Sequence, residues 1–133
     1  MWNKVGQAMT EFAIILPLFF LFLWGIFFLF VYCYNLIALQ TMSRDVARAI
    51  SVNSGSVSEA YEDVKEYYAN KQMANLMVQG YYTWDYSDAI CFPEPTTDGN
   101  DVTVTLTAKS EGTYTVLPQN ISVSTSMYKE SST

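Results

Sequence analysis

The sequence predicts an α+β protein in which a long N-terminal helix carries a small head domain, and three observations lead to this fold class. The segment from Phe12 to Ser43 contains no Asp, Glu, Lys or Arg. An amphipathic pattern with spacings of three and four residues overlaps its end and continues to about Val52. Two segments near the C-terminus alternate apolar and hydroxyl-bearing residues, as half-buried strands do. We therefore expect a head with one further helix and an antiparallel sheet of about three strands.

Composition narrows the function classes. The chain has 133 residues, which suits one small domain plus an appendage, and its net charge is −6. Nucleic-acid binding needs clustered Lys and Arg, and the sequence has no such cluster, so we expect no nucleic-acid partner. The sequence contains no His, the commonest general base and metal ligand. We expect no enzyme, no cofactor and no metal site.

The apolar segment at 12–34 predicts a transmembrane helix. At about 1.5 Å per residue it would extend about 34 Å, enough for a hydrocarbon core of about 30 Å. It is longer than the apolar region of a secretory signal peptide, which has about 7–15 residues. Lys4 lies before the segment and Arg44 and Arg48 lie after it, so the flanking charges nearly balance. We favour a cytoplasmic N-terminus because the short stub before the segment contains no domain to export.

The helix is predicted to continue over 35–52 with an apolar stripe and to stop at Asn53-Ser54-Gly55. The stripe consists of Leu36, Leu39, Met42, Val46 and Ile50. Pro17 removes the hydrogen bond to the carbonyl of Ala13, so we expect a kink there. The kink is either a flexible point for leaving the bilayer or a tolerated membrane proline.

The head is expected to span residues 53–133. Ser56 and Glu59 form a capping box, and a helical stripe that includes Leu76 follows to about Val78, before Gly80. Residues 81–86 are aromatic and favour a strand, and a loop follows through Pro93, Pro95 and 98–100. The two clearest strands cover 102–108 and 121–127, and Val116 and Leu117 suggest a short strand before Pro118.

Other residue groups in the head have a chemical and a structural interpretation. Glu62, Asp63 and Glu66 could form a carboxylate pair or a cation site, but a solvated helix face is favoured. Asp98, Asn100 and Asp101 lack EF-hand spacing, which favours a turn. The aromatic residues at 81–86 could contact a partner or a carbohydrate, although core packing is simpler. Cys33 and Cys91 are expected to be two small buried hydrophobes without a bridge between them.

Glu11 lies directly before the apolar segment, where a carboxylate is costly unless it stays at the membrane interface in the first helical turn. Its spacing suggests a second interpretation. Gly6, four residues, Glu11, Phe12 and then an apolar helix resemble the processing site of type IV pilins. The sequence looks most like the TadE-like minor pilins (pseudopilins) of the Tad/Flp pilus family. The resemblance spans Gly6 to about Val52 and resumes weakly over 120–127.

The resemblance implies a specific life cycle. A prepilin peptidase would remove leader residues 1–6 by cutting between Gly6 and Gln7, leaving the helix at 7–52. Glu11, next to Phe12, would then pair with the new N-terminus of a neighbouring pilin subunit. The implied partners are other pilin subunits through the N-terminal helix, the peptidase, the pilus assembly platform and the membrane. The implied location is the cytoplasmic membrane with the head outside the cytoplasm, and later a cell-surface pilus (fimbrium) used in adhesion.

Two features depart from the pattern: the leader has a single Lys, and position one of the processed chain would be Gln instead of the Phe of the best-known pilins. The size of the head favours a minor subunit. The alternative is a bitopic membrane-anchored binding protein outside the cytoplasm that is neither processed nor polymerised. It predicts that Glu11→Ala is tolerated. A membrane-tethered enzyme that depends on carboxylates is a weaker third reading.

Overall fold

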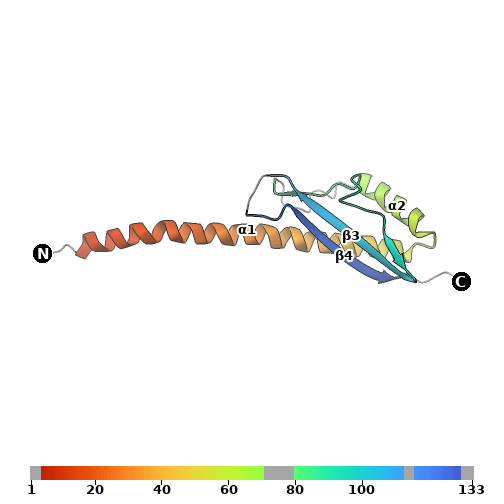
Figure 1. Cartoon of the computed structure of the whole chain (residues 1–133), viewed down its shortest axis with the longest axis horizontal. Helices are drawn as coiled ribbons and strands as arrows, with labels where there is room; N and C mark the ends of the chain where they lie inside the picture. Colours follow the sequence, from red (N-terminus) through yellow and green to blue (C-terminus); the bar gives the residue numbers. More distant parts are fainter. Residues whose placement is uncertain (1–3, 71–79, 113–115, 130–133) are drawn as a thin grey trace.

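The computed structural model describes residues 4–70, 80–112 and 116–129. One helix, α1 (Lys4–Val52), runs through most of the molecule, and the head packs along its C-terminal half (Figure 1). The head contains α2 (Val57–Asn70) and a four-stranded antiparallel sheet. Its strands are β1 (Tyr82–Thr83), β2 (Thr96–Asp98), β3 (Asp101–Ser110) and β4 (Asn120–Tyr128).

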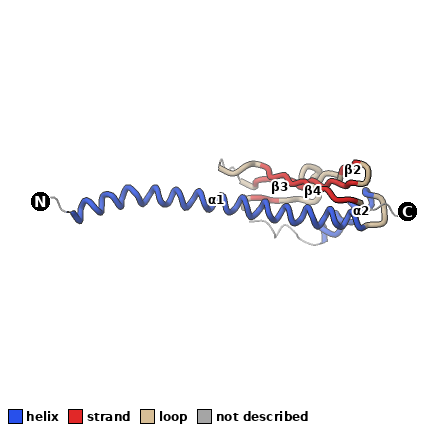
Figure 2. Tube along the Cα trace, turned by 90° about the horizontal axis from the view of Figure 1, so that it is seen from below, coloured by secondary structure: helices blue, strands red, loops and turns tan. Residues whose placement is uncertain are grey.

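The sheet is built around β3, its longest strand. β4 pairs with one edge of β3 along its whole length, while β1 and β2 pair with opposite ends of the other edge. Gly99 turns the chain between β2 and β3 with φ +62, a conformation that glycine adopts without steric cost. The sheet lies lengthwise on one side of α1 (Figure 2).

The core forms where the two predicted periodicities meet. In β3 the even-numbered residues from Val102 to Ala108 are buried, as a period of two requires. They face the apolar stripe of α1, of which Leu39, Met42, Val46 and Ile50 are almost fully buried and Leu36 is partly buried. Ser43 donates a hydrogen bond of 2.6 Å to the Thr125 hydroxyl of β4 and fixes the helix against the sheet.

A second, aromatic layer joins α2 to the loop that follows β1. The ring centroids of Tyr61 and Phe92 are 4.9 Å apart, and Trp84 lies 5.6 Å from Phe92 and 5.4 Å from Tyr68. The buried Tyr61 hydroxyl donates to the Phe92 carbonyl at 2.7 Å. This layer confirms core packing for Trp84, and Tyr82 is buried as well.

The capping box predicted for α2 is present. The Glu59 amide donates to the Ser56 hydroxyl at 3.2 Å, and the Ser56 amide donates to the Glu59 carboxylate at 3.1 Å. The helix is described as far as Asn70. The rest of the predicted helix, with Leu76 and Val78, lies outside the described residues.

Three details of the prediction are wrong. Val116 and Leu117 form no strand. Leu117 is buried, whereas Val116 is exposed. Thr96–Asp98, which was assigned to a loop, forms β2 because the tight turn at Gly99 folds it back on β3. Cys91 is buried as expected, but Cys33 is exposed on α1, and both are free thiols.

Candidate assembly site

The N-terminal half of α1 carries every residue of the predicted processing site. Gly6, Gln7, Glu11, Phe12 and Pro17 all lie within α1, and their side chains or backbone are exposed. The helix is long and apolar enough to cross a membrane, by length and composition. Apart from Phe28, which is half-buried, every described residue from Lys4 to Phe30 is exposed. Within the described residues, the head covers little of this half of the helix.

Gln7 and Glu11 lie one helical turn apart on the same side of α1. The Gln7 side-chain amide donates to the Glu11 carboxylate at 3.5 Å. The Thr10 hydroxyl donates to the Gly6 carbonyl at 2.8 Å, so the predicted cleavage site lies inside the first turns of the helix. The geometry places the amide nitrogen that cleavage would release on the turn just before the carboxylate.

The head ends on α1 at an aromatic contact. Tyr81 meets Phe27 and Phe28 edge-to-face, with ring centroids 6.3 and 6.5 Å apart. From there to Ile50, one face of the helix is covered, beginning with the buried Val31 and Asn35. Asn35 satisfies its side chain by donating to the Val31 carbonyl at 2.7 Å.

Below this contact the same face of α1 continues as an apolar groove of about 700 Å³. Its lining residues follow helical spacing from Pro17 to Phe28 and end at Val116 of the head: Pro17, Phe20, Leu21, Trp24, Gly25, Phe28 and Val116. A Cβ added at Gly25 would meet no atom within 4 Å. The helix continues through Pro17, and a kink there stays a prediction.

The acidic residues of the head that the sequence suggested as a carboxylate or cation site lie on α2 and at the β2–β3 turn. Glu62, Asp63 and Glu66 are exposed on α2, as a solvated face requires, and Glu62 lies 3.9 Å from Lys65. Asp98 and Asp101 flank the β2–β3 turn. Among the described residues there is no group of three or more His, Cys, Asp or Glu that could hold a metal ion.

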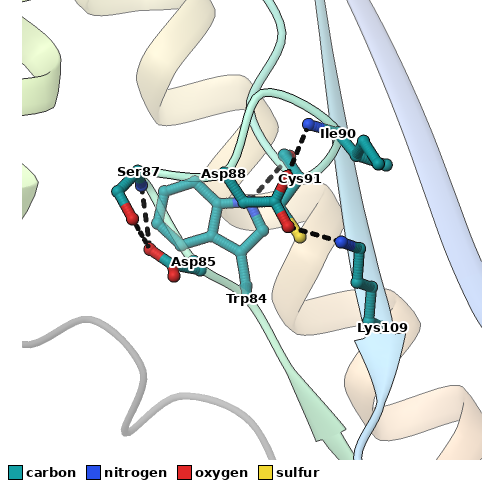
Figure 3. Close-up of polar contacts among 7 residues, drawn as sticks. All are labelled: Trp84, Asp85, Ser87, Asp88, Ile90, Cys91 and Lys109. Atoms are coloured by element: carbon teal, nitrogen blue, oxygen red, sulfur yellow. Dashed lines mark hydrogen bonds and ion pairs between the residues drawn. The ribbon is translucent and has the colours of Figure 1, made fainter.

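A polar cluster of the head that the sequence does not predict lies in the loop 84–92 and includes Lys109 of β3 (Figure 3). Asp88 accepts the Ile90 amide at 2.9 Å and forms an ion pair with Lys109 of β3. The hydrogen bond from Lys109, and then that from Ile90, lowers the pKa of Asp88, and the same pair raises the pKa of Lys109. No sequence signal links these residues, because 21 positions separate Asp88 from Lys109.

The same loop ties the aromatic layer to the sheet. The Cys91 carbonyl accepts the Trp84 indole N–H at 3.0 Å and the Thr107 amide of β3 at 2.9 Å. Between α1 and α2, burial and the nearby Asp45 carboxylate raise the pKa of Tyr68 to about 12, so this hydroxyl stays neutral. These groups stabilise the head, and Tyr68 also lines a cavity of about 440 Å³ together with Asp45 and Asp63.

Comparison with known proteins finds a similarity that lies within α1. The family model described as TadE-like protein matches residues 6–48. The match begins at the predicted cleavage site and ends four residues before the end of α1. No curated protein and no solved structure matches the chain. Over most of α1 the chain is therefore similar to the TadE-like proteins, a family associated with the Tad pilus system.

Proposed function

We propose that this chain is a pilin-like structural subunit, held in the cytoplasmic membrane by α1 until it is incorporated into, or primes, a Tad-type pilus used in surface adhesion. The observation that carries the proposal is the division of α1 into two halves. The C-terminal half is the core of the head, whereas the N-terminal half is exposed around its circumference and carries the TadE-like motif. A helix surface this apolar requires lipid or neighbouring helices around it.

The end of the head on α1 supports a proposal for the position of the membrane. Because the head covers one face of the helix from Phe28 onward, we propose that the segment surrounded by lipid ends near that residue. A hydrocarbon core of about 30 Å takes about 20 helical residues, which places its other boundary near Ala8. The proposed span is therefore shifted toward the N-terminus of the predicted 12–34 segment, and it includes Glu11 at its cytoplasmic edge.

In this position Glu11 needs a cationic partner, since an unpaired charge in a low-dielectric site costs several kcal/mol. Removal of residues 1–6 by a prepilin peptidase would create an ammonium group at Gln7, one turn from Glu11. The same group on a neighbouring subunit would reach Glu11 when two helices stack with a small axial offset. The carboxylate would thus favour one alignment between neighbouring subunits.

The groove from Pro17 to Val116 suits the same assembly. It is a continuation of the face that packs on the head, and small residues such as Gly25 let neighbouring helices approach closely. Other pilin subunits would fill the groove in a pilus and acyl chains would fill it in the membrane. The pilus assembly platform would move the subunit from one environment to the other.

The first test is the intact mass and the N-terminal peptide of the chain extracted from membranes of its native host. The proposal expects a chain that starts at Gln7 with a free α-amino group, because cyclisation of Gln7, which the mass would reveal, would remove the ammonium group that pairs with Glu11. A chain that starts at Met1 would contradict processing. The bitopic anchored binding protein would then be the better description of the molecule.

The second test is pilus assembly by Glu11→Ala, with Glu62→Ala as the matched control. Both variants remove one exposed acid, but Glu62 lies on α2 in the head. We expect Glu11→Ala to reduce assembled pili about tenfold or more, because losing more than about 1.4 kcal/mol of pairing changes an equilibrium tenfold. Equal assembly by the two variants would favour the bitopic anchor.

A further inference from the structure

We propose that the outer edge of β4 binds an extended strand of a different polypeptide, which adds antiparallel to β4 as a fifth strand of the sheet. Sheet edges present unpaired backbone donors and acceptors, and addition of a strand is the interaction that they favour. The proposal rests on the backbone register, on the composition of β4 and on its direction relative to α1.

The register shows which backbone groups face outward. The Ser110 amide donates to the Gln119 carbonyl and the Lys129 amide donates to the Asn100 carbonyl, so the β3–β4 ladder continues at both ends. Directly opposed residues of an antiparallel pair alternate between bonded and non-bonded positions. The odd-numbered residues of β4 therefore bond to β3. Ser122, Ser124 and Ser126 direct their amides and carbonyls to the other edge, where no strand pairs with them within the described ranges.

The composition of β4 leaves this edge unprotected. Asn120–Tyr128 contains no Lys, Arg, Asp, Glu, Pro or Gly, the residues with which natural proteins usually block strand addition. On the opposite edge of the sheet, β1 and β2 have only two and three residues. The nine-residue β4 is thus the one long uncharged edge that the described sheet offers.

An added strand would extend the sheet beyond β4 on both its inner and its outer face. On the inner face Val123, Thr125 and Met127 are only partly buried, so apolar side chains of a neighbouring strand would cover them. On the outer face three pairs of hydroxyl groups lie 3.0–3.3 Å apart: Thr103 with Ser126, Thr105 with Ser124, and Thr107 with Ser122. The partner segment is therefore an uncharged stretch that alternates apolar and hydroxyl-bearing residues.

The direction of β4 argues against a second copy of this chain as the antiparallel partner. Thr125 contacts Ser43, and Lys129 donates to the Gly55 carbonyl just beyond α1, so β4 runs in the same direction as α1. An antiparallel β4 of a second copy would point its α1 the opposite way. Two chains anchored in one membrane cannot adopt that arrangement, and this step rests on the membrane anchoring proposed above.

Photocrosslinking in native membranes tests the proposal on the full-length chain. A photoreactive amino acid is placed in turn at Ser122, Ser124 and Ser126, and the linked peptides are identified by mass spectrometry. Thr103 and Thr105, on the same face of the interior strand β3, are the control positions. We expect crosslinks from β4 to one segment of a different protein, with the linked residue number falling by about two for each step of two along β4. This pattern is the register of an antiparallel strand.

Three outcomes would overturn the proposal: crosslinks to β4 of this chain, equal yields from Thr105 and Ser124, or linked sites without an antiparallel register. The N-terminal mass, measured on the same sample, reports separately whether the chain was processed. An unprocessed chain with the crosslink pattern would reject the pilin role and leave the strand partner in place. A processed chain without the pattern would do the reverse.

Variants give a second, independent readout. Ser124→Pro removes an outward amide without breaking the β3–β4 ladder, and Ser124→Lys adds an edge charge. The control Thr105→Lys adds the same charge on the same face, one strand further in. We expect both Ser124 variants to lower the Ser122 crosslink yield, Ser124→Pro by about two- to tenfold, the equivalent of one hydrogen bond. We expect Thr105→Lys to leave the yield unchanged, and unchanged yields in all three variants with wild-type melting temperatures would contradict the proposal.

Discussion

Asp88 illustrates what a single residue contributes to the head. Its carboxylate accepts the Ile90 amide and pairs with Lys109, and its carbonyl accepts the Phe92 amide at 2.9 Å. The Lys109 hydrogen bond lowers the pKa of Asp88 in the folded state. The folded chain thus binds fewer protons here than the unfolded chain. The stabilisation is present above the ordinary carboxyl pKa of about 3.9 and is lost as the pH falls through the lowered value.

We therefore expect Asp88→Asn to weaken the pH dependence of stability. The wild-type melting temperature should fall as the pH decreases below about 4, and the variant should show a smaller fall. Thermal unfolding of the detergent-extracted chain at a series of pH values measures the difference. Glu66→Gln, which removes an exposed carboxylate from α2, is the control and should follow the wild-type curve. Identical curves for Asp88→Asn and wild type would show that the ion pair adds nothing.

Individual residues differ in how far the sequence could predict them. Glu11 stands out because a charge directly precedes a long apolar segment, at a fixed spacing from Gly6. Asp88 and Lys109 are ordinary surface residues in the sequence, and only the pairing of the loop 84–92 with β3 brings them together. Cys33 was misassigned because an apolar neighbourhood in the sequence does not distinguish the covered side of a helix from its exposed side.

At the scale of elements, the packing of α1 against the sheet holds the head together. Leu39 is fully buried in this interface, whereas Ile37, two residues earlier, is 62% exposed. We expect Leu39→Ala to reduce the free energy of unfolding by about 2–5 kcal/mol, because it removes buried methyl groups and leaves a cavity. Denaturant unfolding of the full-length chain in detergent measures the loss.

Ile37→Ala is the matched control on the same helix. It removes a similar side chain from a position that is mostly exposed, so the free energy of unfolding should change by about 0.5 kcal/mol or less. Equal losses for the two variants would contradict the assignment of the buried face. They would show that the free energy of unfolding reports on the helix alone.

The elements that the sequence predicted well are those with long, regular patterns. The period of 3.6 in α1 and the period of two in β3 each identify one buried face, and both faces are confirmed. β2 was missed because its three residues lie between Pro95 and Gly99 in a segment rich in turn formers. The sequence also does not predict the residue of α1 at which the head ends. Lipid and a β-sheet both select apolar residues, so the composition of α1 does not change at Phe28.

For the whole molecule, the proposed membrane span depends on where the head ends on α1, and Cys33 can test it. The exposed Cys33 lies about 8 Å along the helix axis beyond Phe28. If the hydrocarbon core ended at Tyr34, as the sequence alone predicts, this thiol would lie among acyl chains and react slowly. If the core ends near Phe28, the thiol lies in water beside the head.

We therefore expect a membrane-impermeant maleimide to label Cys33 from outside in intact protoplasts or spheroplasts. Cys33→Ser should abolish the label, because the buried Cys91 becomes reactive only after denaturation. Labelling only after lysis would place the head in the cytoplasm and reverse the proposed orientation. Labelling only in detergent would place Cys33 in the bilayer, so the head would have to release the helix from Phe28 to Tyr34 on insertion. Rapid labelling of intact protoplasts or spheroplasts is the one result that agrees with all three expectations. These are a head that stays packed on α1, the shifted span and an N-terminus in the cytoplasm.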